Sequence, residues 1–223
     1  MLLTEPAVSQ ENRATSVLAR LASMVSFSVV LVLVLSGCIR AKVDARVSKD
    51  GMVSGVFELA IADQMLAYVG QDRATVLREV RNAAAANTDA GVTVTAIDTV
   101  AFVGERITFE GVPSDRFGAT IAAIARTAGP FGALIAQDFE LIQVKNRWRF
   151  TGTVNLSPEQ FDLSAAGGAD PALPAKLFEM SLKLTFPGPV VGRDKSAKVK
   201  GRSITWTPKL GKVTRMQALA RTR

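Results

Sequence analysis

Residues 138–156 read DFELIQVKNRWRFTGTVNL and contain the clearest hairpin pattern in the chain. Apolar and polar residues alternate along both halves of this stretch, which is typical of strands with one buried face. Residues 145–146 supply the turn between the halves. We therefore predict two antiparallel strands, in which Arg147 and Arg149 share one face and Trp148 lies on the other.

Similar patterns extend outward from this hairpin in both directions. Strands are predicted at 39–47, 52–61, 92–100, 106–112, 138–144, 147–156, 176–186, 197–200, 203–207 and 213–219. Helices are predicted at 62–68, 72–86 and 115–127, a turn at 103–105 and a long loop at 157–174. This order predicts a single α+β domain, built as a largely antiparallel, curved β-sheet with about three helices packed on it.

The beginning of the chain predicts export. Arg13 and Arg20 precede an uncharged apolar run at 21–35, and Leu35-Ser36-Gly37-Cys38 follows. A basic segment, an apolar segment and small residues before a cleavage point are typical of a signal peptide. We predict that residues 1–37 are removed and that Cys38 is acylated, which holds the protein on the extracytoplasmic face of the plasma membrane. An uncleaved signal anchor, with Cys38 buried in the interface, is the alternative.

The composition argues against most catalytic chemistry. The chain has no histidine and one cysteine, which excludes Ser-His-Asp triads, Cys-His pairs and intramolecular disulfides. Glu58, Glu110 and Glu140 fall on alternating strands and are expected on solvent faces. No catalytic set, metal cluster or cofactor motif emerges, so we expect no enzyme. A hydrolase that uses these carboxylates is the competing hypothesis.

Positive charge is concentrated at the end of the sequence. The net charge is +7, and residues 193–223 hold ten Lys or Arg against one Asp. We therefore divide the chain into a signal peptide (1–37), an α+β ectodomain core (38–192) and a basic, β-rich end (193–223). Two interpretations of this positive charge are open. It is attracted to anionic headgroups, or it lies on the solvated faces of edge strands. Nucleic acid is not expected as a partner, because an aromatic stacking platform is missing.

Several short motifs resemble the LppM-type lipoproteins of actinobacteria. They are the tetrapeptide at 35–38, Asp-Gly-Met-Val-Ser-Gly at 50–55, Phe-Pro-Gly-Pro-Val at 186–190 and Ile-Thr-Trp at 204–206. The resemblance implies a lipid-anchored α+β domain of the cell envelope that binds lipid or glycolipid rather than acting as a catalyst. Many relatives continue into a hydrophobic span after this region, whereas this sequence ends on a basic tail. Cys38 is therefore the expected anchor.

Two kinds of partner follow from this interpretation. In the first, an apolar cavity binds acyl chains, and Arg147 and Arg149 hold an anionic headgroup at its mouth. The candidate wall residues are Phe102, Phe109, Phe139, Phe150, Met180 and Trp148. In the second, a sheet edge or the loop at 157–174 docks an envelope protein.

Overall fold

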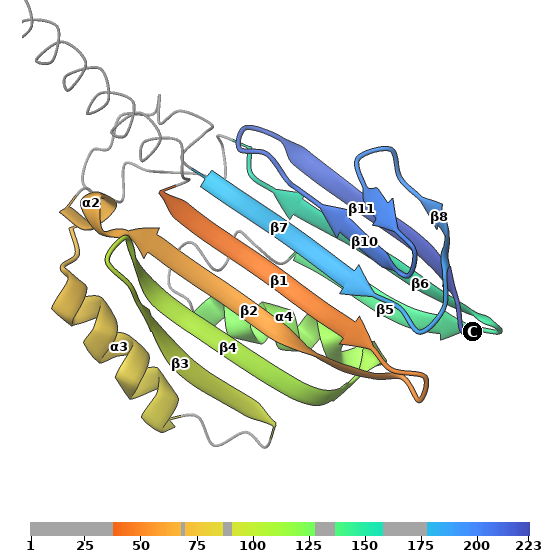
Figure 1. Cartoon of the computed structure of the whole chain (residues 1–223), viewed down its shortest axis with the longest axis horizontal. Coiled ribbons are helices and arrows are strands. Elements are labelled where there is room, and N and C mark those ends of the chain that lie inside the picture. Colours follow the sequence, from red (N-terminus) through yellow and green to blue (C-terminus); the bar gives the residue numbers. More distant parts are fainter. Residues whose placement is uncertain (1–37, 68–69, 87–90, 128–136, 158–177) are drawn as a thin grey trace, which may run out of the picture. The chain divides into compact units, whose positions relative to one another are not determined.

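The computed structural model describes residues 38–67, 70–86, 91–127, 137–157 and 178–223 (Figure 1). Its strands are β1 (Ile39–Val47), β2 (Met52–Ala62), β3 (Val92–Asp98), β4 (Phe102–Pro113), β5 (Gln137–Val144), β6 (Arg147–Asn155), β7 (Phe178–Thr185), β8 (Val190–Arg193), β9 (Lys198–Lys200), β10 (Ser203–Trp206) and β11 (Val213–Arg221). Its helices are α2 (Asp63–Leu66), α3 (Arg73–Ala86) and α4 (Phe117–Thr127). The α+β class is confirmed. The predicted signal peptide and residues 158–174 of the predicted loop lie outside the described residues.

The strands divide between two sheets rather than one. The larger has seven strands in the order β3-β4-β2-β1-β7-β10-β9, and the smaller has four in the order β5-β6-β11-β8 (Figure 1). Neighbouring strands are antiparallel except for β1 and β7, which run parallel. The largely antiparallel character is therefore confirmed, while the second sheet is a feature that local patterns did not reveal.

The β1–β2 hairpin follows directly from its alternating sequence. Every second residue of β1, from Ile39 to Val47, is buried, and the residues between them face outward. On the outer face, Lys183 Nζ of β7 lies 2.9 Å from Asp44 Oδ2. Gly51 closes the turn with a φ of +87°, which is a conformation that glycine adopts without strain.

The predicted turn at 103–105 is wrong. Strand β4 begins at Phe102, and the chain reverses just before it, where the Thr99 amide donates to the Phe102 carbonyl at 3.0 Å. Gly104 lies inside the strand. A Cβ at this position would come within 2.1 Å of the Leu59 carbonyl oxygen, so the strand needs a glycine there. Its presence therefore reflects close backbone packing rather than a turn.

Smaller differences concern the ends of elements. Strand β8 was not predicted, and it pairs with β11 at one edge of the smaller sheet. Helix α4 begins at Phe117, after a short 3-10 turn at Ser114–Arg116, instead of at residue 115. The predicted start of α3 is supported by Asp72, whose Oδ1 accepts the Thr75 amide at 2.9 Å.

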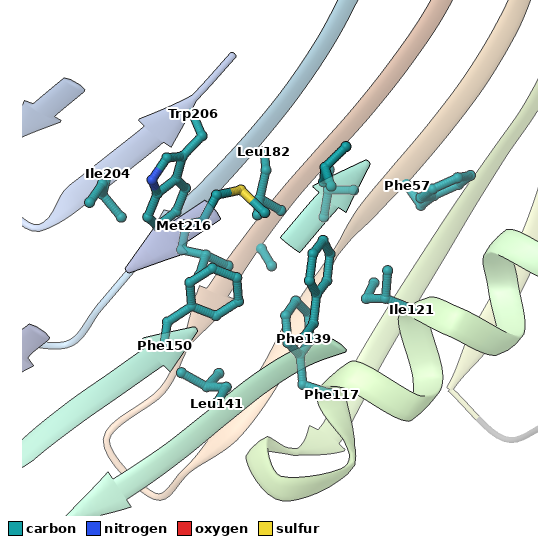
Figure 2. Close-up of a cluster of buried hydrophobic side chains, with 14 of the residues drawn as sticks. Phe57, Phe117, Ile121, Phe139, Leu141, Phe150, Leu182, Ile204, Trp206 and Met216 are labelled. Atoms are coloured by element: carbon teal, nitrogen blue, oxygen red, sulfur yellow. The ribbon is translucent and has the colours of Figure 1, made fainter. Parts of the chain in front are cut away.

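The hydrophobic core lies between the two sheets and α4. Figure 2 shows side chains from both sheets and from the helix pointing toward one another. Phe117 and Ile121 of α4 are fully buried there. Helix α4 approaches β5 closely at Gly118, where a Cβ would come within 1.7 Å of the Phe139 carbonyl oxygen. The two sheets and α4 therefore form one packed unit.

Candidate functional site

Most of the predicted cavity-wall residues belong to this packed core. Five of the six are at least nine-tenths buried, namely Phe109, Phe139, Phe150, Met180 and Trp148. The Phe139 and Phe150 ring centroids are 5.7 Å apart, and those of Phe150 and Trp206 are 5.2 Å apart. These contacts are normal for aromatic pairs in a protein interior, so the side chains fill space against one another.

Phe102 is the exception. It lies at the start of β4, outside the main core, and packs with the small cluster formed by Cys38, Ala62 and Met65. The Arg40 guanidinium carbon lies 4.5 Å above the centre of its ring. This cation–π contact places Phe102 apart from the other five candidates.

The predicted alternation at 147–149 is confirmed. Trp148 is 1% exposed and faces the core, while Arg147 and Arg149 are exposed on the other face of β6. The Trp148 indole lies beneath the β1–β2 turn, since its Cη2 would be 3.4 Å from a Cβ at Gly51. Its Nε1 has no hydrogen-bond partner in the part of the chain that the structure describes.

The two arginines line an open surface groove of about 1240 Å³. The groove lies where the β5–β6 turn, the β1–β2 turn and the end of β11 meet. Its lining residues are Lys49, Gln143, Val144, Lys145, Asn146, Arg147, Arg149, Leu219, Arg221, Thr222 and Arg223. Six of these are Lys or Arg, and none of them is Asp or Glu. We call this surface the basic groove.

The strand register places like charges side by side in the basic groove. Arg147 of β6 stands directly opposite Arg221 of β11, and Val144 of β5 faces Arg147 from the other side. Two residues further along β6, on the same face, Arg149 stands opposite Leu219. Like charges in directly opposite positions destabilise a sheet unless an anion lies between them. Among the described residues, neither Arg147 nor Arg221 forms an ion pair.

The surroundings of the groove fix its shape. The Thr222 amide donates to the Asn146 carbonyl at 3.2 Å, which ties the end of β11 to the β5–β6 turn. Arg149 Nη2 lies 3.8 Å from Glu140 Oε2, and both side chains are half exposed. Solvent screening makes such a pair weak, so Arg149 is available to a stronger anion.

The predicted lipidation residue lies at the other end of the larger sheet. Cys38 directly precedes β1, and its carbonyl accepts the Ala62 amide at 2.6 Å. Its side chain is 3% exposed, and the Gln64 amide nitrogen lies 3.7 Å from its Sγ. The residue predicted to carry the anchor is thus hydrogen-bonded to the sheet itself.

Within the described ranges, the carboxylates form no group with evident chemistry. Glu58 pairs with Arg106 at 2.7 Å, and Glu110 is exposed on β4. Glu105, in contrast, is 6% exposed, and its Oε1 has no hydrogen-bond partner among the described residues. Burial raises the pKa of this carboxyl. Sequence reasoning missed its burial because it assigned this residue to a turn.

Neither a metal-binding cluster nor a membrane-spanning helix is present among the described residues. They contain no group of three or more Cys, Asp or Glu side chains that could hold a metal ion. No helix among them combines the length and the apolar character needed to cross a bilayer.

Sequence reasoning found only part of the basic groove. It selected Arg147 and Arg149 but not Lys49 or Leu219, because these two come from segments far from the hairpin in the chain. The charge count pointed to residues 193–223, yet the groove combines the end of that region with two turns from the rest of the domain.

Comparison with known proteins places the chain in a family. The model of the LppM domain family matches residues 40–222. The folded domain of Mycobacterium tuberculosis LppM, solved by NMR, superposes with a TM-score of 0.56 at 19% identity, over 83% of this chain and 91% of that one. No curated protein matches the chain. With its family match covering almost all of the described domain, the chain belongs to the LppM family of cell-envelope lipoproteins.

Proposed function

We propose that this protein is a non-catalytic lipoprotein, anchored through acylated Cys38, that binds an anionic lipid or glycolipid in its basic groove. The observation that carries the proposal is the cross-strand pair Arg147 and Arg221, which stand opposite each other without an acidic partner among the described residues. Guanidinium groups bind phosphate and carboxylate groups in a bidentate manner, so a headgroup of this kind would relieve their repulsion.

The apolar part of the lining supports an amphiphile rather than a simple ion. Val144 is 44% exposed, and Leu219 stands beside Arg149 on the same face. Apolar side chains framed by cations match a ligand with a charged headgroup and an adjoining hydrocarbon portion. The proposed ligand lies on the outer face of the smaller sheet, whereas the sequence alone favoured the interior.

The anchor requires a change at one side chain. Diacylation attaches two chains to the sulfur of Cys38, a residue that is buried in a cluster with Ala62 and Met65, so this side chain must turn outward. Its backbone can keep the hydrogen bond to Ala62. Intact-mass measurement of the cellular protein should give residues 38–223 with acyl chains attached. A retained leader or an unmodified thiol would remove the anchor from the proposal.

Binding can be measured with short-chain lipids below their micelle concentration. Dihexanoyl phosphatidylglycerol should bind the purified lipoprotein, and dihexanoyl phosphatidylcholine should bind much more weakly. The double variant Arg147→Gln/Arg221→Gln should lose affinity by about tenfold or more, because each charged contact contributes on the order of 1 kcal/mol.

A matched control removes two charges elsewhere. Lys198 and Lys200 are exposed on the edge strand β9 and do not line the groove. The variant Lys198→Gln/Lys200→Gln should retain nearly all of the affinity. Equal losses in the two double variants, or equal binding of the two lipids, would contradict the proposal. Native mass spectrometry of the same preparations would identify a copurified lipid.

A further inference from the structure

The basic groove and the predicted anchor lie at opposite ends of β1. Cys38 directly precedes this strand, and Lys49, which lines the groove, lies in the turn just after it. Figure 1 shows β1 running from the end near α2 to the end where the β1–β2 turn and the C-terminus lie. Nine extended residues at about 3.3 Å each span about 30 Å.

The anchor has no flexible linker to the sheet. Residue 39 already pairs with Ile61 of β2, and the Cys38 carbonyl accepts the Ala62 amide. A lipid attached at Cys38 therefore holds the end of the sheet itself close to the bilayer. When β1 stands along the membrane normal, this short tether leaves the far end of the sheet pointing away from the same surface.

The two ends also differ in electrostatic character. Near the anchor, Arg73 pairs with Asp63 at 2.8 Å and also contacts Asp98, so its charge is compensated. At the far end, five of the six cationic side chains of the basic groove form no ion pair among the described residues, and the sixth, Arg149, pairs with Glu140. The unbalanced positive charge thus lies about 30 Å from the anchor, several times the screening length of about 8 Å at physiological salt.

We propose that the groove engages a second anionic lipid surface, opposite the anchoring membrane, so that the protein bridges two lipid surfaces. This inference rests on the proposed function, because it takes the anchor at Cys38 and anionic-headgroup binding in the groove as given. It adds that the bound headgroup belongs to a lipid surface that faces the anchoring membrane. The headgroups of the anchoring leaflet are out of reach, and headgroups facing them are within reach.

Vesicle bridging tests the inference with the full lipoprotein. The acylated protein is reconstituted into phosphatidylcholine vesicles, and fluorescent vesicles containing phosphatidylglycerol are added. Docking of the second vesicles is measured by co-flotation. We expect docking with the wild type and with Lys198→Gln/Lys200→Gln, and a loss of at least tenfold with Arg147→Gln/Arg221→Gln.

A linker variant tests the geometry itself. Thirty Gly/Ser residues inserted between Cys38 and Ile39 span about 30 Å on average, enough for the groove to fold back onto its own membrane. When the anchoring vesicles also contain phosphatidylglycerol, the wild type should still dock second vesicles, and the linker variant should lose most of this docking.

The outcomes separate the two proposals. If short-chain phosphatidylglycerol binds in the groove but the wild type docks no second vesicle, the bridging inference is overturned and the proposed function stands. Equal docking by the wild type and the linker variant would also overturn the inference. If the short-chain lipid does not bind at all, the proposed function itself fails.

Discussion

At the scale of single residues, the fold disfavours the charged form of one carboxyl group and favours the charged form of another. Glu105 is buried, and no described residue forms a hydrogen bond with its Oε1. Asp194 accepts hydrogen bonds from Trp206 Nε1 at 2.7 Å and from the Gln217 amide at 2.8 Å. Trp206 belongs to the larger sheet and Gln217 to the smaller one, so Asp194 links the two sheets. Each group should therefore affect stability with a different dependence on pH.

Glu105 should destabilise the fold at neutral pH. Burial raises the pKa of this carboxyl above its ordinary value of 4.5, so the folded state holds the proton more tightly than the unfolded chain does. Its contribution is favourable below that value and is lost as the pH rises through the folded-state pKa. We expect Glu105→Gln to raise the free energy of unfolding at pH 7 and to change it little at pH 4.

Urea denaturation of wild type and Glu105→Gln from pH 4 to pH 8 measures this difference. Glu110→Gln is the control, because that residue lies exposed on the same strand. A loss of stability in Glu105→Gln that is the same at every pH would show instead that the Glu105 side chain makes a favourable contact that does not depend on its charge.

Asp194 should stabilise the fold at neutral pH, and its contribution should change with pH in the opposite direction to that of Glu105. Burial alone raises its pKa, but hydrogen bonds from Ser196, Gln217 and Trp206 outweigh burial and lower the pKa overall. This stabilisation is present above the ordinary value of 3.8 and is lost as the pH falls through the folded-state pKa. Asp194→Asn should lower the free energy of unfolding at pH 7 by about 1 to 3 kcal/mol.

The effect of Asp194→Asn should shrink as the pH falls below 3.8. Asp115→Asn, at an exposed aspartate, should stay within about 0.5 kcal/mol of the wild type at neutral pH. Chemical denaturation across this range provides the test. Equal stabilities of wild type and Asp194→Asn at pH 7 would mean that Asp194 does not hold the sheets together.

At the scale of elements, the position of α4 depends on one close approach. Gly118 lets the helix lie against the Phe139 carbonyl of β5, and Phe117 and Ile121 then reach the core. A glycine inside a helix normally costs stability relative to alanine. Here the missing Cβ is what allows the helix and the strand to pack.

Gly118→Ala should therefore destabilise the protein by about 2 kcal/mol, because the added methyl group overpacks the contact. Helix propensity alone would give a gain of about 1 kcal/mol. Ala119→Gly, at the exposed neighbouring position, should cost up to about 1 kcal/mol and so report the propensity effect alone. If Gly118→Ala melts at or above the wild-type temperature, α4 does not pack against β5 as described.

Local sequence patterns predicted most of these elements but not their partners. Alternation identified β1 and β6 and their faces, because one buried face leaves a period of two in the sequence. It could not reveal that β1 pairs in parallel with β7, since the partner of a strand is set by tertiary packing. Gly104 misled the prediction because glycine serves both turns and close backbone contacts.

At the scale of the whole molecule, the candidate site joins three separate segments. The charge count predicted a basic region, and alternation predicted that Arg147 and Arg149 share a face. Neither could predict that Arg221 would stand opposite Arg147, because β6 and β11 are far apart in the sequence and their register is set by tertiary packing. The core aromatics looked like a cavity wall because burial in a core and lining of a pocket require the same residue types.

The location of the ligand tests the central claim most directly. Isotope-labelled protein, titrated with dihexanoyl phosphatidylglycerol and followed by amide NMR spectra, should show shifts at Arg147, Arg149, Leu219 and Arg221. Dihexanoyl phosphatidylcholine should leave the same signals nearly unchanged. Shifts concentrated at the Trp148 indole and at Phe150, with the groove signals unmoved, would contradict the account and place the ligand in the core instead.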